Sequence, residues 1–208
     1  MQIDLSKIGM EKGRQYETII STVDSEGNLN AAPIGVICRG PNSIMCRIFK
    51  GSTTLENIIS QKEFVVNISD DPELFTWSLL DNLQTDDFNE NKSIKNIGCY
   101  FKCEVTDLKE AVKQSDPIKK KGEAIVIKAD VVELVINKPV KAYNRAFSYV
   151  LESLVNFSRL DIVDDAQREY YLKSFSEAYR VIKKVGSKKD KESMNKIKHK
   201  IQEKGYEV

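Results

Sequence analysis

Residues 43–59, with the sequence SIMCRIFKGSTTLENII, predict a β-strand, a tight turn and an α-helix in that order. Ile44, Cys46 and Ile48 fall on one face of the strand, because successive side chains of a strand point to opposite sides. Gly51 follows the strand, and glycine adopts the positive φ angles that sharp turns require. This stretch therefore supplies one buried strand face and an abrupt change of direction.

The helix of this stretch is predicted to begin among three consecutive hydroxyl residues, Ser52, Thr53 and Thr54. Their oxygens can cap the first backbone N–H groups, and Thr53 with Glu56 has the spacing of a capping box. The apolar face of the helix is expected to consist of Leu55, Ile58 and Ile59.

Arg47 and Lys50 place two positive charges just before this helix start. A helix N-terminus attracts anions, because its first N–H groups have no partner in the helix and the helix dipole is positive there. Arg47 could hold phosphate oxygens through its planar guanidinium group, and Lys50 could add a point charge. The alternative is an ordinary strand–turn–helix whose cations point into water. Neither the Walker phosphate-binding motif nor the GxGxxG dinucleotide motif occurs in the sequence.

The composition is that of a folded protein without a broad basic field. The 208 residues are 41% hydrophobic and 30% charged, with a formal net charge of +1. This charge balance argues against nucleic acid as a partner. The N-terminal sequence lacks the features of a signal peptide, and no apolar run approaches the ~20 residues that cross a bilayer. We therefore expect a cytoplasmic protein without a membrane partner.

The cysteines and the single histidine do not predict a metal site. The cysteines lie in apolar, strand-like runs without a CxxC motif, which favours buried free thiols over a disulfide or a metal centre. His199 lies in a lysine-rich segment, far in the sequence from any candidate nucleophile, so we expect neither zinc nor a catalytic triad. The four cysteines are Cys38, Cys46, Cys99 and Cys103.

Further apolar runs predict an antiparallel β body around this stretch. Strands are expected at residues 17–23, 29–39, 64–68, 99–106 and 124–136, after a polar lead-in over residues 1–15 and with a turn at 119–122. The run 29–39 is interrupted at Ala31–Pro33, and because proline cannot donate to a sheet ladder, we expect a strand edge or a bulge there. Such a segment leaves room for a flat ligand, and it equally marks a barrel corner.

Two other segments allow more than one interpretation. Asn67 is the one polar residue of the run 64–68, and it either binds a ligand or satisfies neighbouring backbone groups. Residues 73–96 show no clear period, and residues 86–91 within them are expected to be a surface loop. The expected anchors of this segment are Phe75, Trp77, Leu79 and Leu80.

After Pro139 the apolar period changes from two to about 3.6, which predicts helices. One helix is indicated by Ala142, Ala146, Tyr149, Val150 and Leu154, a second by Tyr170, Tyr171, Phe175, Ala178, Tyr179 and Ile182, and a third over residues 189–204 by Met194, Ile197 and Ile201. The predicted fold is mainly β with α: an antiparallel, closed or split β-barrel with an internal helix over residues 1–140, and a helical C-terminal extension over 141–208 packed on the barrel.

The sequence resembles the FMN-binding split barrels, a superfamily that includes flavin reductases and pyridoxamine-phosphate-oxidase-like proteins. The resemblance rests on the motifs GNLNAAPIG at 27–35, RIFKGSTTLEN at 47–57 and FVVN at 64–67. More closely, the chain resembles a small, poorly characterised archaeal-type family, in which a helix similar to residues 144–160 follows the barrel.

The resemblance implies FMN as the cofactor and a homodimer with each flavin near the subunit interface. The FMN phosphate would be bound by Arg47, Lys50, Gly51, Ser52, Thr53 and Thr54. The ribityl chain or the isoalloxazine ring would border Asn30, Ala31, Ala32 and Pro33, with Asn67 as a nearby side-chain partner. The helix of 144–160, from the same or the other chain, would add Arg145 and Arg159.

The resemblance implies an FMN-dependent oxidoreductase that moves a hydride or electrons between a diffusible small molecule and the flavin. Because a flavin carries the redox chemistry itself, no encoded acid–base triad is needed. The alternative is a non-catalytic FMN carrier or sensor. Binding of nucleic acid or protein through residues 183–204 is the weakest hypothesis, because the lysines there alternate with acidic residues as on a solvated helix face.

Overall fold

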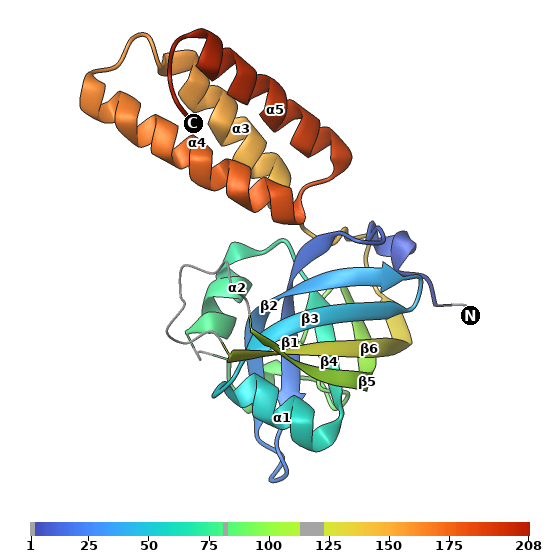
Figure 1. Ribbon diagram of the computed structural model, residues 1–208. Helices are drawn as coiled ribbons and strands as arrows, with labels where there is room; N and C mark the ends of the chain where they lie inside the picture. Colours follow the sequence, from blue (N-terminus) through green and yellow to red (C-terminus); the bar gives the residue numbers. More distant parts are fainter. Residues whose placement is uncertain (1–2, 81–82, 113–122) are drawn as a thin grey trace. The chain divides into compact units, whose positions relative to one another are not determined.

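The computed structural model describes residues 3–80, 83–112 and 123–208, and its contacts divide the chain into two compact units (Figure 1). The first unit is Met1–Tyr143 and holds the strands, and the second is Asn144–Val208 and is helical. The sequence placed this boundary between residues 140 and 141. Each unit has its own hydrophobic core.

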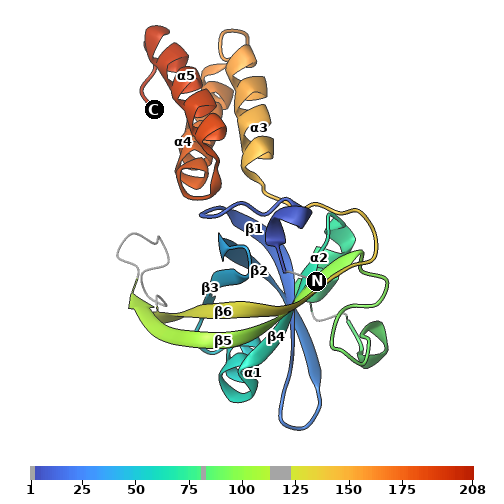
Figure 2. The ribbon, with the colours of Figure 1, turned by 90° about the vertical axis from the view of Figure 1, so that its right-hand side faces the viewer.

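The first unit is a closed antiparallel barrel with the strand order β1-β2-β3-β6-β5-β4 (Figure 2). Its strands are β1 (Gln15–Val23), β2 (Leu29–Gly40), β3 (Ser43–Phe49), β4 (Glu63–Ile68), β5 (Cys99–Val112) and β6 (Glu123–Ile136). The helix α1 (Thr53–Gln61) lies between β3 and β4 in the chain. The predicted fold class is confirmed, and five of the six strands begin and end within about two residues of their predicted positions. The turn predicted at 119–122 lies outside the described residues.

The barrel core follows the alternation of the strands. Ile44, Cys46 and Ile48 of β3 are buried in it, as the two-residue period predicts. All four cysteines are buried free thiols, which confirms that expectation. Burial raises the pKa of the Cys46 thiol to about 12 and that of Cys99 to about 11. Such thiols stay protonated and unreactive near neutral pH.

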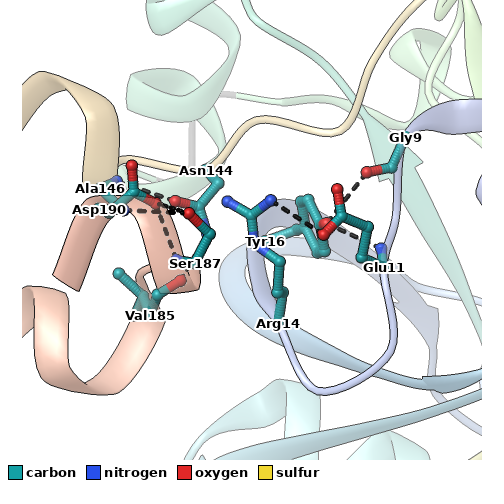
Figure 3. A network of polar contacts seen from close by, with 9 residues as sticks. All are labelled: Gly9, Glu11, Arg14, Tyr16, Asn144, Ala146, Val185, Ser187 and Asp190. Atoms are coloured by element: carbon teal, nitrogen blue, oxygen red, sulfur yellow. Dashed lines mark hydrogen bonds and ion pairs between the residues drawn. The ribbon is translucent and has the colours of Figure 1, made fainter. Parts of the chain in front are cut away.

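The lead-in is more than a polar arm, and that prediction was wrong. A short 3₁₀ helix, η1 (Leu5–Ile8), brings Leu5, Ile8 and Met10 into the main barrel core, where all three are buried. The segment is fixed by Tyr16, whose hydroxyl accepts from the Glu11 N–H at 2.8 Å and donates to the Gly9 carbonyl at 3.0 Å (Figure 3). A run of this length is too short to show a period, which is why its apolar residues gave no signal.

The segment after β4 contains a short helix that exposes two of its apolar residues, Trp77 and Leu79. This helix, α2 (Pro72–Leu79), is capped by Asp71, whose side chain accepts from the Glu73 N–H at 2.9 Å. Phe75 packs into a small cluster with Ile19 and Ala31, but the other three predicted anchors, Trp77, Leu79 and Leu80, are exposed, so those predictions were wrong. The predicted loop 86–91 contains the end of the 3₁₀ helix η2 (Thr85–Asp87) and a buried Phe88.

The second unit consists of α3 (Ala146–Arg159), α4 (Asp165–Val185) and α5 (Lys188–Glu203). Its core contains most of the predicted apolar residues, among them Val150, Phe175, Ile182, Met194, Ile197 and Ile201. Three assignments were wrong, because Ala142 belongs to the barrel core while Leu154 and Tyr170 are exposed on the helix surfaces.

Asn144 fixes the start of α3 against the end of α4. Its amide oxygen accepts from the Ala146 N–H at 2.9 Å, and its amide nitrogen donates to the Val185 carbonyl at 2.9 Å (Figure 3). Ser187 and Asp190 then form a capping box that begins α5. Among the described helices, none is both long and apolar enough to cross a membrane.

Candidate functional site

The start of α1 has the local geometry of an anion site. Gly51 has a φ of +79°, so the chain turns sharply between β3 and the helix. Ser52 is the N-cap residue: its hydroxyl donates to the Phe49 carbonyl at 3.0 Å and accepts from the Leu55 N–H at 3.4 Å. Thr53 and Thr54 are the first two helical residues, whose N–H groups have no acceptor within an α-helix.

Two details of the predicted helix were wrong. Ser52, not Thr53, occupies the N-cap, so the capping box of Thr53 and Glu56 does not form. Ile59 is exposed, and the buried face of α1 contains the polar residues Thr54 and Asn57 beside Leu55 and Ile58. The helix start is therefore tied to its surroundings by polar contacts as well as by apolar packing.

A network of four polar side chains joins α1 to the β1–β2 hairpin. Asn30 of β2 donates from its amide to the Thr54 hydroxyl at 2.9 Å and to the Thr22 hydroxyl at 3.4 Å. Asn57 donates to the same Thr22 hydroxyl at 3.1 Å. The contact between Asn30 and Thr54 brings together two motifs that the sequence singled out separately. Thr22 and Asn57 were missed, although polar residues within apolar periods could have marked them.

One half of β2 has a strand partner on one side only, and residues of α1 and α2 contact this strand. The strand pairs with β1 from Leu29 to Ile37, but with β3 only from Val36 onward. Residues 29–35 therefore lie at an edge, which confirms the edge expectation for Ala31–Pro33, whereas the irregular register lies between Cys38 and Gly40.

The backbone groups of this edge can be assigned from the pairing. The Glu17 N–H of β1 donates to the Tyr143 carbonyl at 2.8 Å and so points away from β2. Because the groups alternate along an antiparallel pair, Ala31 and Pro33 direct their backbone polar groups away from β1, toward the side of β2 that has no strand partner there. Pro33 fits this place because it has no N–H to offer a ladder.

The two predicted cations have different surroundings. Arg47 projects from the face of β3 opposite the core; its Nε and Nη2 atoms are buried, and its guanidinium carbon lies 5.3 Å from the Phe49 ring centroid. Lys50 forms an ion pair with Glu110 of β5, with 2.7 Å between Nζ and Oε1. The hydrogen bond from Lys50 lowers the pKa of the Glu110 carboxyl. The pair therefore persists at neutral pH, where the carboxylate is charged.

Asn67 is held entirely by protein groups. It is 0% exposed, its amide nitrogen donates to the Ile19 carbonyl at 3.1 Å and to the Ser21 hydroxyl at 2.9 Å, and its oxygen accepts from the Ile94 N–H at 2.9 Å. Of the two interpretations of Asn67, this geometry favours the satisfaction of neighbouring backbone groups. The residue fixes the segment around Ile94 to the sheet.

Arg145 and Arg159 lie in the second unit, at the two ends of α3. Fourteen residues of helix separate them by about 21 Å along the axis, so the two guanidinium groups of one chain cannot meet at one phosphate. Their role toward the barrel site stays a prediction. Among the described residues no group of three or more His, Cys, Asp or Glu side chains could hold a metal ion.

Comparison with known protein families shows to which family this chain belongs. Residues 16–138 match the family described as protein of unknown function (DUF447), N-terminal domain, and residues 144–199 match its companion model, protein of unknown function (DUF447). The chain belongs to the DUF447 family. Another relative, the uncharacterized protein MJ1453 of Methanocaldococcus jannaschii, is 27% identical over 179 residues, which are 84% of this chain and 92% of that protein.

A solved structure of a DUF447 protein provides the link to a ligand. The FMN-bound protein MM1853 of Methanosarcina mazei is 27% identical, with coverage of 93% of this chain and 98% of that one and a TM-score of 0.53. The resemblance of the DUF447 chain to FMN-binding split-barrel proteins is thereby confirmed. The similarity extends through both units of the chain.

Proposed function

We propose that this chain binds FMN and acts as a flavin-dependent oxidoreductase. The observation that carries the proposal is the FMN-bound DUF447 relative, which matches 93% of this chain. The local geometry supports it independently, because a glycine turn, a capped helix start and an arginine with buried nitrogen atoms occur within residues 47–54.

The phosphate of FMN fits the start of α1. Thr53 and Thr54 would donate their backbone N–H groups, and the Thr53 hydroxyl is exposed beside them. Arg47 and Lys50 would neutralise the phosphate charge, Arg47 through its planar fork and Lys50 after it exchanges Glu110 for the ligand. Gly51 has open space where a side chain would be, so nothing crowds this approach.

The isoalloxazine ring would lie along the half of β2 that has no second strand partner. Asn30 is bonded to Thr54 at the helix start, and Ala31 and Pro33 follow it along the edge. The phosphate and the ring can therefore occupy neighbouring places, with the outward backbone groups of Ala31 and Pro33 meeting the polar edge of the ring. Small side chains in this half of β2 leave one face of such a ring accessible to a substrate.

A bound flavin supplies hydride and single-electron transfer. The residues of this chain have the task of holding the phosphate, orienting the ring and leaving a face open. The described site contains no histidine or reactive thiol for proton transfer, since all four cysteines are buried elsewhere and His199 is exposed on α5. A proton would then come from solvent or from the reducing substrate.

The first test is the visible absorption spectrum of the purified protein, followed by release and identification of the chromophore. We expect flavin bands, release of FMN on denaturation and bleaching under anaerobic conditions by a nicotinamide or deazaflavin donor. Flavin bands that no donor bleaches would refute the oxidoreductase and favour a carrier. A colourless protein that does not bind added FMN would refute the whole proposal.

Replacing Glu110 with glutamine is expected to strengthen FMN binding by about twofold to fivefold, because the carboxylate that competes with the phosphate for Lys50 is then neutral. The measurement is a titration of apoprotein with FMN followed by flavin fluorescence. Asp107→Asn is the matched control: it removes the same charge from β5, but its partners are Lys109 and Lys128. Equal affinities of Glu110→Gln and Asp107→Asn would contradict a role of Lys50 at the phosphate.

A further inference from the structure

The second unit carries a strong local charge that the balanced total conceals. Residues 180–200 contain nine lysine or arginine residues and two acidic ones. Both acidic residues are engaged locally: Asp190 accepts from Ser187 in the capping box of α5, and Glu192 pairs with Lys188 at 3.8 Å. Glu177 and Glu203, just outside this range, pair with Arg180 and Lys200. Among the described residues, these acids leave Lys183, Lys191 and Lys198 without an ion pair.

Some of these lysines lie at a groove formed by residues of α4 and α5, two helices that are in contact. The groove has a volume of about 200 Å³ and is lined by Tyr179, Ile182, Lys183, Lys191, Met194 and Asn195. The Nζ atoms of Lys183 and Lys198 lie 4.5 Å and 5.3 Å from the Tyr179 ring centroid. Lys183 and Lys191 therefore line one small concavity, and Lys198 approaches the ring of Tyr179, which lines it too.

The polar groups of this groove are donors. Tyr179 donates its hydroxyl to the Asn195 amide oxygen at 2.7 Å, which leaves the Asn195 NH₂ group as the donor end of that side chain. Within the described part of the chain, no carboxylate lies within 4.0 Å of the Lys183, Lys191 or Lys198 ammonium groups. Like charges gathered without a counter-charge repel one another, and a bound anion would relieve that repulsion.

We propose that this groove binds a phosphate group, held by Lys183, Lys191 and Lys198 with the Asn195 amide as a further donor. Lysine suits this ligand, because its ammonium acts as a compact point charge toward phosphate. We expect the groove to recognise the charge of the phosphate and not to stack a nucleic-acid base. The Tyr179 ring already has Phe175 stacked on it at a centroid distance of 5.9 Å, and the lysines lie near that ring. The phosphate belongs either to a free phosphate compound or to a nucleic-acid backbone.

The test compares two triple variants of the full chain. Lys183→Gln, Lys191→Gln and Lys198→Gln remove the groove cations. Lys189→Gln, Lys196→Gln and Lys200→Gln remove the same charge from the other side of α5, since residues of a helix are about 100° apart around its axis. Glutamine preserves helix propensity, so both variants should keep the wild-type helical signal and thermal unfolding.

Two probes are titrated at low and at moderate salt: inorganic pyrophosphate, and a mixed-sequence single-stranded DNA of about 12 nucleotides. We expect the groove variant to lose about tenfold or more in affinity and the control variant about threefold or less, because screened charges outside the groove contribute little. A triple Lys→Arg variant of the groove should keep most of the binding.

If the protein binds pyrophosphate at least as tightly as it binds the DNA, the ligand is a free phosphate compound. Much tighter DNA binding with a steep salt dependence would identify a nucleic-acid backbone. Equal losses in the two triple variants would show general charge attraction and overturn the groove. So would a wild-type protein that binds neither probe. Both triple variants leave the barrel site intact, so the difference between them does not depend on FMN.

Discussion

Replacing both Arg47 and Lys50 with alanine is expected to weaken FMN binding by about a hundredfold, since each lost charge-assisted contact contributes about a tenfold factor. The free energy of unfolding of the apoprotein should fall by about 2 kcal/mol or less, because Lys50 lies near the surface and Arg47 packs on Phe49 at the end of a strand. FMN titration gives the affinity, and denaturant unfolding gives the stability.

The control for this pair is Arg39→Ala with Lys12→Ala. Both residues are exposed, and Arg39 lies near the end of β2 opposite to Asn30, about 30 Å away along an extended strand. The control removes the same net charge from the same unit, so a general electrostatic effect would appear in both proteins. Full retention of flavin by the Arg47→Ala, Lys50→Ala protein would remove the phosphate assignment.

The sequence predicted well those features that depend on a local period. Ile44, Cys46 and Ile48 alternate along β3, and Gly51 with Ser52 marks the turn into α1, so strand, turn and helix are found where they were expected. The positions of these elements result from neighbours in the chain, which a sequence displays directly. The candidate anion site at the start of α1 is likewise determined by residues that are neighbours in the chain.

Contacts between distant residues could not be predicted in this way. Asn30 bonds to Thr54 across 24 residues, and Lys50 pairs with Glu110 across 60. The surroundings of Leu5 likewise depend on the barrel that the later strands close. Each of these contacts can be predicted only when the order of the strands in the sheet is known. That order results from many packing interactions that are individually weak. Individual side chains of one segment do not reveal it.

Asn67 is such a case, and its replacement gives the second large expected effect. Asn67→Ala should lower the free energy of unfolding of the barrel by about 3 kcal/mol, because the Ile94 N–H and the Ser21 hydroxyl are left buried without this partner. The melting temperature should fall by about 10 °C. The affinity of the folded protein for FMN should stay within about threefold, because the buried amide has no surface to offer a ligand.

Ser21→Ala is the graded control for Asn67, since it removes one hydrogen bond of the amide and leaves the bonds to Ile19 and Ile94. The Ser21 hydroxyl also donates to the Lys92 carbonyl at 2.6 Å, and this bond is lost as well, so we expect Ser21→Ala to cost about 2 kcal/mol, less than the Asn67→Ala effect. Calorimetric unfolding of apoprotein and FMN titration at 25 °C separate the two quantities. If Asn67→Ala lost FMN affinity tenfold at unchanged stability, the amide would be a ligand contact and the structural role assigned to it here would be wrong.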